Sequence, residues 1–154
     1  MPPASTCSFR PAVEADVPFL IALRVATMTP HFERQGLDVS DEEHRLRAES
    51  SLAAAAIVEV GGQPVGVIKV LQDGTTWTIE QFQVAPEHQG HGLGTMVLRA
   101  VIADARRSGA LLRLSVLKRN PAARLYARLG FRTLAESANS YKMTFIDTEA
   151  PSAG

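Results

Sequence analysis

Apolar and polar residues alternate along some parts of the chain and recur with helical spacing along others. Alternation or short apolar runs predict strands at residues 7–11, 57–60, 64–71, 76–84, 111–117, 131–135 and 141–146. Helical spacing predicts helices at about residues 16–28, 40–52, 92–108 and 121–129, with a short helix or lid at 30–36. This order predicts one domain over residues 1–154, of the α+β class. Helices would cover both faces of a mixed, mostly antiparallel sheet of about seven strands, giving three layers.

Turn and cap residues support several of these boundaries. The glycine pair at 61–62 and the Asp-Gly pair at 73–74 predict hairpin turns, which would join the middle strands into an antiparallel meander. Ser40, followed three residues later by Glu43, matches a capping box at the start of a helix. Asp16 is of a residue type that caps helices, and we expect it to begin the first long helix.

The composition is that of an ordinary globular protein, with 45% hydrophobic residues, 21% charged residues and a formal net charge of zero. A neutral chain gives no reason to expect nucleic acid or an anionic membrane as a partner. The charges are nevertheless uneven: residues 99–132 contain nine basic residues and one acidic residue, whereas residues 33–49 contain six acidic and three basic residues. These segments are either solvated helix faces or the surroundings of a polyanionic and a cationic ligand, respectively.

The single cysteine, Cys7, excludes an internal disulfide and any metal site with several cysteines. No apolar run approaches the roughly 18 residues of a membrane-spanning helix. The first residues lack the basic start and apolar centre of a secretion signal, so a cytoplasmic location is expected. Residues 1–6 and 147–154 are mostly small and polar, and we expect both ends to be disordered.

A glycine-rich turn joins the strand predicted at 76–84 to the helix predicted at 92–108. Pro86 ends the strand pattern, and glycines follow at positions 90, 92 and 94. Bare N–H groups in such a turn, together with the dipole of the following helix, form an anion site. A dinucleotide fingerprint would need a glycine where Thr95 stands, and the Gly-Lys-Ser/Thr of a nucleotide triphosphate loop is absent.

A second motif lies some 30 residues downstream of this turn. The sequence QGHGLGT at residues 89–95, combined with NPAARLYARLGF at residues 120–131, closely resembles the GNAT superfamily of acetyl-CoA-dependent acetyltransferases. The resemblance covers residues 64–145 well and the N-terminal helices by element order alone. It implies a sheet that is splayed at the acyl-CoA site.

The resemblance also implies a set of cofactor contacts. Backbone N–H groups of the glycine turn would bind the pyrophosphate of coenzyme A, because glycines let the phosphates approach closely. The opened edge of the preceding strand would pair with the pantetheine arm, and one N–H there would polarise the thioester carbonyl. The residues expected to contact acetyl-CoA are Phe82, Val84 (the polarising N–H), Gln89, Gly90, His91, Gly92, Leu93, Gly94, Thr95, Asn120 and Tyr126.

Tyr126 matches the general acid of the family. A departing coenzyme A thiolate resembles cysteine, with a pKa of about 8.5, and a phenol with a pKa of about 10 holds its proton at pH 7 and can still donate it. The alternative is that Tyr126 is simply a packed aromatic residue of its helix.

The acceptor amine must also lose a proton. A lysine-like amine is uncharged at pH 7 in only about one molecule in 2,500. Glu80 is the candidate base, since two-residue spacing places it on the strand face of Phe82 and Val84 unless a bulge intervenes; an exposed strand glutamate is the alternative. His31 and Glu33 lie in the lid region, where they are candidate acceptor contacts or bases.

Together these observations predict an N-acetyltransferase that moves an acetyl group from acetyl-CoA directly to a primary amine of a small molecule, peptide or protein. The acidic segment 38–49 slightly favours a cationic acceptor. No metal is implied, and a monomer or homodimer is expected. The alternative is a non-catalytic acyl-CoA sensor or interaction module on the same fold.

Overall fold

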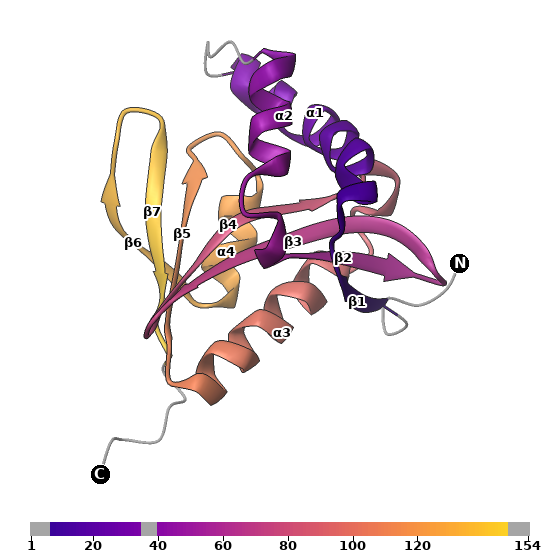
Figure 1. Cartoon of the computed structure of the whole chain (residues 1–154). Coiled ribbons are helices and arrows are strands. Elements are labelled where there is room, and N and C mark those ends of the chain that lie inside the picture. Colours follow the sequence, from indigo (N-terminus) through magenta and orange to yellow (C-terminus); the bar gives the residue numbers. More distant parts are fainter. Residues whose placement is uncertain (1–6, 35–39, 148–154) are drawn as a thin grey trace.

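The computed structural model describes residues 7–34 and 40–147, and it describes no side chains for residues 28–34 or Asp41. A seven-stranded sheet has the order β1-β2-β3-β4-β5-β7-β6 (Figure 1). The strands are β1 (Cys7–Pro11), β2 (Ala55–Val60), β3 (Gln63–Asp73), β4 (Thr76–Val84), β5 (Leu111–Leu117), β6 (Phe131–Glu136) and β7 (Ser140–Phe145). The α-helices are α1 (Val17–Arg34), α2 (Asp41–Glu49), α3 (Leu93–Ser108) and α4 (Ala122–Leu129).

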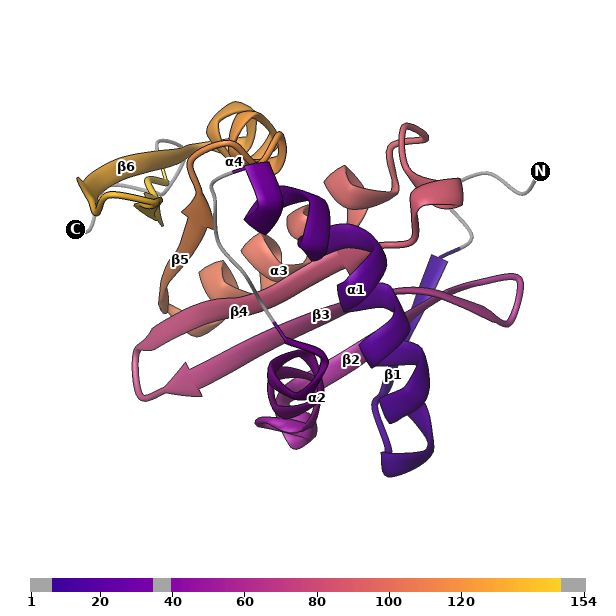
Figure 2. The ribbon, with the colours of Figure 1, turned by 90° about the horizontal axis from the view of Figure 1, so that it is seen from above.

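Helices cover both faces of this sheet. Helix α1 crosses one face of the sheet, α2 stands upright on the same face, and α3 lies on the opposite face (Figures 1 and 2). Each face has its own apolar core: the larger one packs α3 and Tyr126 of α4 against the strands, and the smaller one lies under α1. Every strand pair is antiparallel except β4 with β5. The expected α+β, three-layer fold with a mixed sheet is therefore confirmed.

The hairpin and cap predictions are largely confirmed. Gly61 and Gly62, with φ angles of 59° and 78°, turn β2 into β3, a conformation that favours glycine at both positions. The Ser40 side chain accepts a hydrogen bond from the Glu43 N–H at 3.1 Å and caps α2. Helix α2 ends at Glu49, earlier than predicted, and a separate 3-10 turn follows at Leu52–Ala54.

The predicted break at Pro30 is wrong, because α1 continues through this proline to Arg34. Proline cannot donate the helical bond to the carbonyl four residues earlier. That carbonyl belongs to Ala26, which is exposed, so water can replace the lost partner. The predicted lid ends at residues 35–36, which lie outside the described residues. Residues 1–6 and 148–154, which were predicted to be disordered, also lie outside them.

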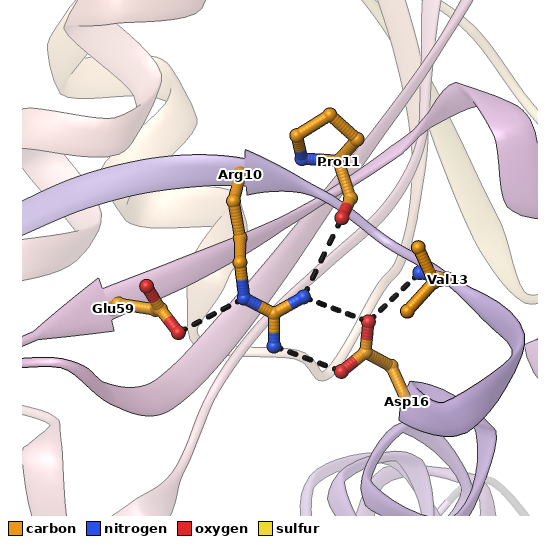
Figure 3. A network of polar contacts seen from close by, with 5 residues as sticks. All are labelled: Arg10, Pro11, Val13, Asp16 and Glu59. Atoms are coloured by element: carbon orange, nitrogen blue, oxygen red, sulfur yellow. Dashed lines mark hydrogen bonds and ion pairs between the residues drawn. The ribbon is translucent and has the colours of Figure 1, made fainter.

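Asp16 does not cap α1 as predicted but lies in the 3-10 turn Glu14–Asp16 that precedes it. Its carboxylate accepts the N–H of Val13 at 2.8 Å and binds both terminal nitrogens of Arg10 at 2.9 Å. Arg10 also donates from Nε to Glu59 of β2 at 2.9 Å (Figure 3). This network joins β1 and β2 to the 3-10 turn from which α1 starts.

No helix in the described ranges has the length and apolar character needed to span a membrane.

Candidate active site

The sheet opens between its two central strands. β4 and β5 pair in parallel only where Thr76–Ile79 of β4 lies beside residues 111–114 of β5. Beyond this point β5 stays paired with β7 as far as Leu117, whereas β4 runs on to Val84 without a partner on that side. Figure 2 shows the two strands starting together and diverging. Because the strands diverge, one backbone edge of β4 is unpaired from Glu80 onward, although β4 is the central strand of the sheet.

The free hydrogen-bonding groups on this edge can be identified from one bond. The Ala85 N–H donates to the Val65 carbonyl of β3 at 2.8 Å. Because successive residues of a strand direct their N–H and C=O groups to opposite edges, those of Val84 and Phe82 point away from β3 and toward the opening. The Val84 carbonyl accepts the side-chain amide of Gln89 at 2.8 Å, so the loop that follows β4 is tied back to the open edge.

The glycine turn presents unsatisfied N–H groups. Gly90 and Gly92 both have φ near 81°, a left-handed conformation that glycine adopts without strain. Helix α3 starts directly after Gly92 and has no side-chain cap. The first N–H groups of a helix have no acceptor within it, so those of Leu93, Gly94 and Thr95 are available to an anion at the positive end of the helix dipole.

These features surround a cleft of about 490 Å³, a size typical of small-molecule sites. Its lining residues are Thr27, Phe82, Gln83, Val84, Gln89, Gly90, Gly92, Gly94, Thr95, Asn120, Pro121, Ala122, Leu125 and Arg128. Gly94 keeps the cleft open: a Cβ there would lie 3.3 Å from Leu125 and 3.4 Å from Phe82. All residues expected to contact the cofactor line this cleft except His91, Leu93 and Tyr126. His91 is exposed on the turn, and the Leu93 side chain is buried in the core.

Helix α4 forms the wall opposite the glycine turn. Asn120 lines the cleft and accepts the N–H of Ala122, the first residue of α4, at 2.9 Å through its side-chain oxygen, which leaves its two amide N–H donors for a ligand. Arg128 lines both this cleft and a neighbouring cavity of about 410 Å³, which Arg99 and Arg106 also line. Of the basic residues in 99–132, Arg128 alone therefore lines the cleft together with the glycine turn.

Tyr126 lies behind this wall. Its side chain is 6% exposed and packs edge-on against Phe131, with ring centroids 5.6 Å apart. The hydroxyl has no hydrogen-bond partner among the described residues. Burial raises the pKa of the phenol above its ordinary value, which keeps it protonated. Its helix neighbours Ala122 and Leu125 line the cleft.

Glu80 lies at a bulge, so the face expected from two-residue spacing is wrong for this residue. In the register of β3 and β4, Lys69 pairs with Gln81 and Val70 with Ile79, which leaves Glu80 unpaired. Ile79 and Phe82 pack on the α3 face, whereas the Lys69 side chain donates to α2 on the other face. Desolvation lowers the pKa of Lys69, and the nearby negative charge of Glu80 opposes this shift. Glu80 is exposed on the side of α1 and α2.

The lid candidates His31 and Glu33 belong to α1, but their side chains lie outside the described part of the chain. Their expected contacts with the acceptor remain predictions.

The sequence analysis missed a set of five buried polar side chains, one of which lines the cleft. Arg24, His44, Lys69, Gln81 and Gln83 are the buried polar side chains of the described residues, and all come from α1, α2, β3 or β4. The one sequence signal was a lysine within the otherwise apolar run of β3. Among the described residues, no three His, Cys, Asp or Glu side chains gather as a metal site.

The chain matches the model of the Acetyltransferase (GNAT) family over residues 17–131. It therefore belongs to this family and is an acyltransferase. No curated protein sequence matches the chain significantly.

Solved structures support the fold. PaiA N-acetyltransferase from Thermoplasma acidophilum, in complex with coenzyme A, has a TM-score of 0.73 at 15% identity, over 90% of this chain and 98% of that one. Ard1 from Thermoplasma volcanium has a TM-score of 0.71 at 19% identity, over 92% and 99% of the chains. N-acetylglutamate synthase from Neisseria gonorrhoeae, complexed with coenzyme A and N-acetyl-glutamate, has a TM-score of 0.67 at 25% identity, over 90% of this chain and 34% of that one.

Proposed function

We propose that this protein transfers an acetyl group from acetyl-CoA directly to a primary amine of a small molecule, peptide or protein. The observation that carries the proposal is the convergence of two backbone devices on one cleft: the open edge of β4 and the uncapped start of α3. The first suits the amide groups of a pantetheine arm, and the second suits a pyrophosphate. The coenzyme A bound in the PaiA structure is consistent with this assignment.

In this proposal the phosphates lie on the N–H groups of residues 93–95, with Arg128 nearby. The pantetheine arm follows the edge of β4, where it pairs with Phe82 and Val84. The Val84 N–H then donates to the thioester carbonyl oxygen and stabilises the negative charge that develops there. Asn120 contributes its amide N–H donors from the opposite wall.

The chemistry needs one base and one acid. The acceptor nitrogen attacks the thioester carbonyl carbon, the C–S bond breaks, and the sulfur leaves as a thiolate. We assign the proton lost by the amine to Glu80, directly or through water, because Glu80 is accessible on the α1 and α2 side of β4. The thiolate takes a proton from Tyr126, which as a phenol is protonated at pH 7.

We further propose that the chain acts as one catalytic domain, as a monomer or homodimer in the cytoplasm, without a metal, nucleic acid or membrane. His31 and Glu33 of α1 would contact the acceptor.

The proposal is tested by measuring thiol release from acetyl-CoA in the presence of candidate acceptors: amino acids, polyamines, aminoglycosides and peptide N-termini. We expect at least one amine to stimulate release. Tyr126→Phe should lower kcat by about 100-fold or more while coenzyme A still binds, because only the proton donor is removed. Tyr141→Phe, at the chain's other tyrosine, is the matched control and should retain activity.

Binding of acetyl-CoA without stimulated release by any amine would instead favour the non-catalytic sensor. Equal activity of Tyr126→Phe and the wild type would remove Tyr126 from the mechanism and leave the transfer reaction in place.

A further inference from the structure

The space between the helices α1 and α2 and the strands β3 and β4 contains buried positive charge. Arg24 is 8% exposed and Lys69 is 1% exposed, and no acidic side chain is buried among the described residues. Figure 2 shows α1 crossing over these strands, with α2 beside it on the same face of the sheet. Burial of a charge is costly unless a partner of opposite sign or several hydrogen bonds compensate for it.

Lys69 has such compensation. Its ammonium donates to the backbone carbonyls of Arg47 at 3.1 Å and of Ser50, both at the end of α2. A cation at this end of a helix also interacts favourably with the helix dipole. Lys69 therefore has a structural role, which is to hold the end of α2 on the sheet.

Arg24 has none. Its Nε is buried without a hydrogen-bond partner, and no ion pair joins it to any described residue. Desolvation, followed by the charge of Arg47, lowers the pKa of Arg24 to about 10, against an opposing effect of Glu43. Arg24 is therefore still a cation at pH 7, and Glu43 is itself exposed. A buried guanidinium Nε that has no partner in the described part of the chain suits a site whose anion is supplied by a ligand.

Arg24 belongs to the helix that borders the cleft. Thr27 lines the cleft three residues after Arg24, about 4.5 Å farther along the axis of α1. Gln83 also lines the cleft and accepts a hydrogen bond from Gln81 at 2.6 Å, and Gln81 pairs across the strands with Lys69. This hydrogen bond and the strand register thus link the wall of the cleft to Lys69, one of the two buried cations.

We propose that the acceptor is a small amine that also carries a carboxylate, as an amino acid does, and that Arg24 binds this carboxylate. The inference rests on the proposed acetyl transfer and names its acceptor class. The planar guanidinium suits a carboxylate through two parallel hydrogen bonds. With the carboxylate there, the amine points toward the open edge of β4. The acidic segment 38–49 favoured a cationic acceptor, and those of its acidic side chains that the structure describes, Glu42, Glu43 and Glu49, are exposed on α2.

The test compares each of the common amino acids with its amide, in which the amine stays and the carboxylate charge is removed. Thiol release from acetyl-CoA measures kcat and KM for both members of each pair. We expect the best acceptor to be an amino acid and its amide to have a KM about 10- to 100-fold higher, as removal of a charge-assisted hydrogen bond requires.

Substitution at position 24 assigns the effect to this side chain. Arg24→Gln should raise the KM for the amino acid by a similar factor, with little change for the amide or in the affinity for coenzyme A. Arg24→Lys should partly restore the KM. Arg45→Gln, at an exposed arginine of α2, is the matched control and should resemble the wild type. Arg24→Gln should also melt no lower than the wild type, because it removes an unpaired buried charge.

Two results would overturn the inference while leaving acetyl transfer intact. One is equal use of amino acids and amides by the wild-type protein, which does not depend on any variant folding. The other is an equal effect of Arg24→Gln on both members of a pair, together with a lower melting temperature. Absence of release with every amine would overturn the proposed function and this inference together.

Discussion

The side-chain amide of Gln89 donates a 2.8 Å hydrogen bond to the carbonyl oxygen of Val84. This bond connects the loop before α3 to the last residue of β4, whose N–H faces the open edge. We predict that Gln89→Met, which preserves length but not the donor, loosens the glycine turn relative to β4. The affinity for coenzyme A should fall by about 5- to 10-fold, the value of one lost neutral hydrogen bond. Calorimetric titration measures it, with the exposed Glu87→Gln as a control.

Arg128 and Arg124 form a matched pair of exposed arginines on α4, of which only Arg128 lines the cleft. We predict that Arg128→Gln weakens coenzyme A binding by about tenfold or more, because a charge-assisted contact to phosphate is lost, and that Arg124→Gln has little effect. Dephospho-coenzyme A then identifies the phosphate: a smaller loss with this ligand assigns Arg128 to the 3′-phosphate. Equal effects of the two variants would contradict a role for Arg128.

Glu80, unpaired at the bulge of β4, is predicted to accept the proton of the acceptor amine. Glu80→Gln should lower kcat by about 100-fold near pH 7, as loss of a general base does. The deficit should shrink as the pH rises toward the pKa of the free amine, because the amine then enters already deprotonated. A pH profile of kcat measures this effect, and Glu42→Gln, at an exposed glutamate, is the control. A deficit that does not change with pH would remove Glu80 as the base.

Asp16 provides a pH-dependent contribution to stability. Its hydrogen bonds from Arg10, reinforced by the Val13 N–H, lower the pKa of the carboxyl against the opposing effect of desolvation. The folded pKa therefore lies below the unfolded value of about 3.9. The pairing stabilises the fold above that value and is lost as the pH falls through the folded pKa.

We accordingly predict that Asp16→Asn melts at a lower temperature than the wild type at pH 7, and that the difference disappears in strong acid. Thermal unfolding followed at several pH values tests this. Glu14→Gln, at the exposed acid of the same 3-10 turn, should have no comparable effect. A difference that persists in acid would indicate a cause other than the charge of Asp16.

Much of the fold could be predicted from local signals. The predicted limits of β4 and β5 match the structure because residues typical of turns or helix starts lie on both sides of each strand. The end of α1 was not predictable in this way. Proline disfavours a helix interior, yet exposure of Ala26 and packing of α1 on the sheet outweigh this local preference.

The sequence by itself determined the order of elements, the glycine turn and the resemblance to an acyl-CoA site, because each depends on residues close together in the chain. Only the tertiary structure decided which face Glu80 occupies, since a bulge is defined by the register of two strands. The tertiary structure also decided that Arg24 and Gln83, which lie far apart in sequence, are both buried between α1, α2 and the sheet. Long-range packing of α1 on β4 brings the helix that carries Arg24 to the cleft, and burial turns an ordinary helix arginine into a candidate substrate contact.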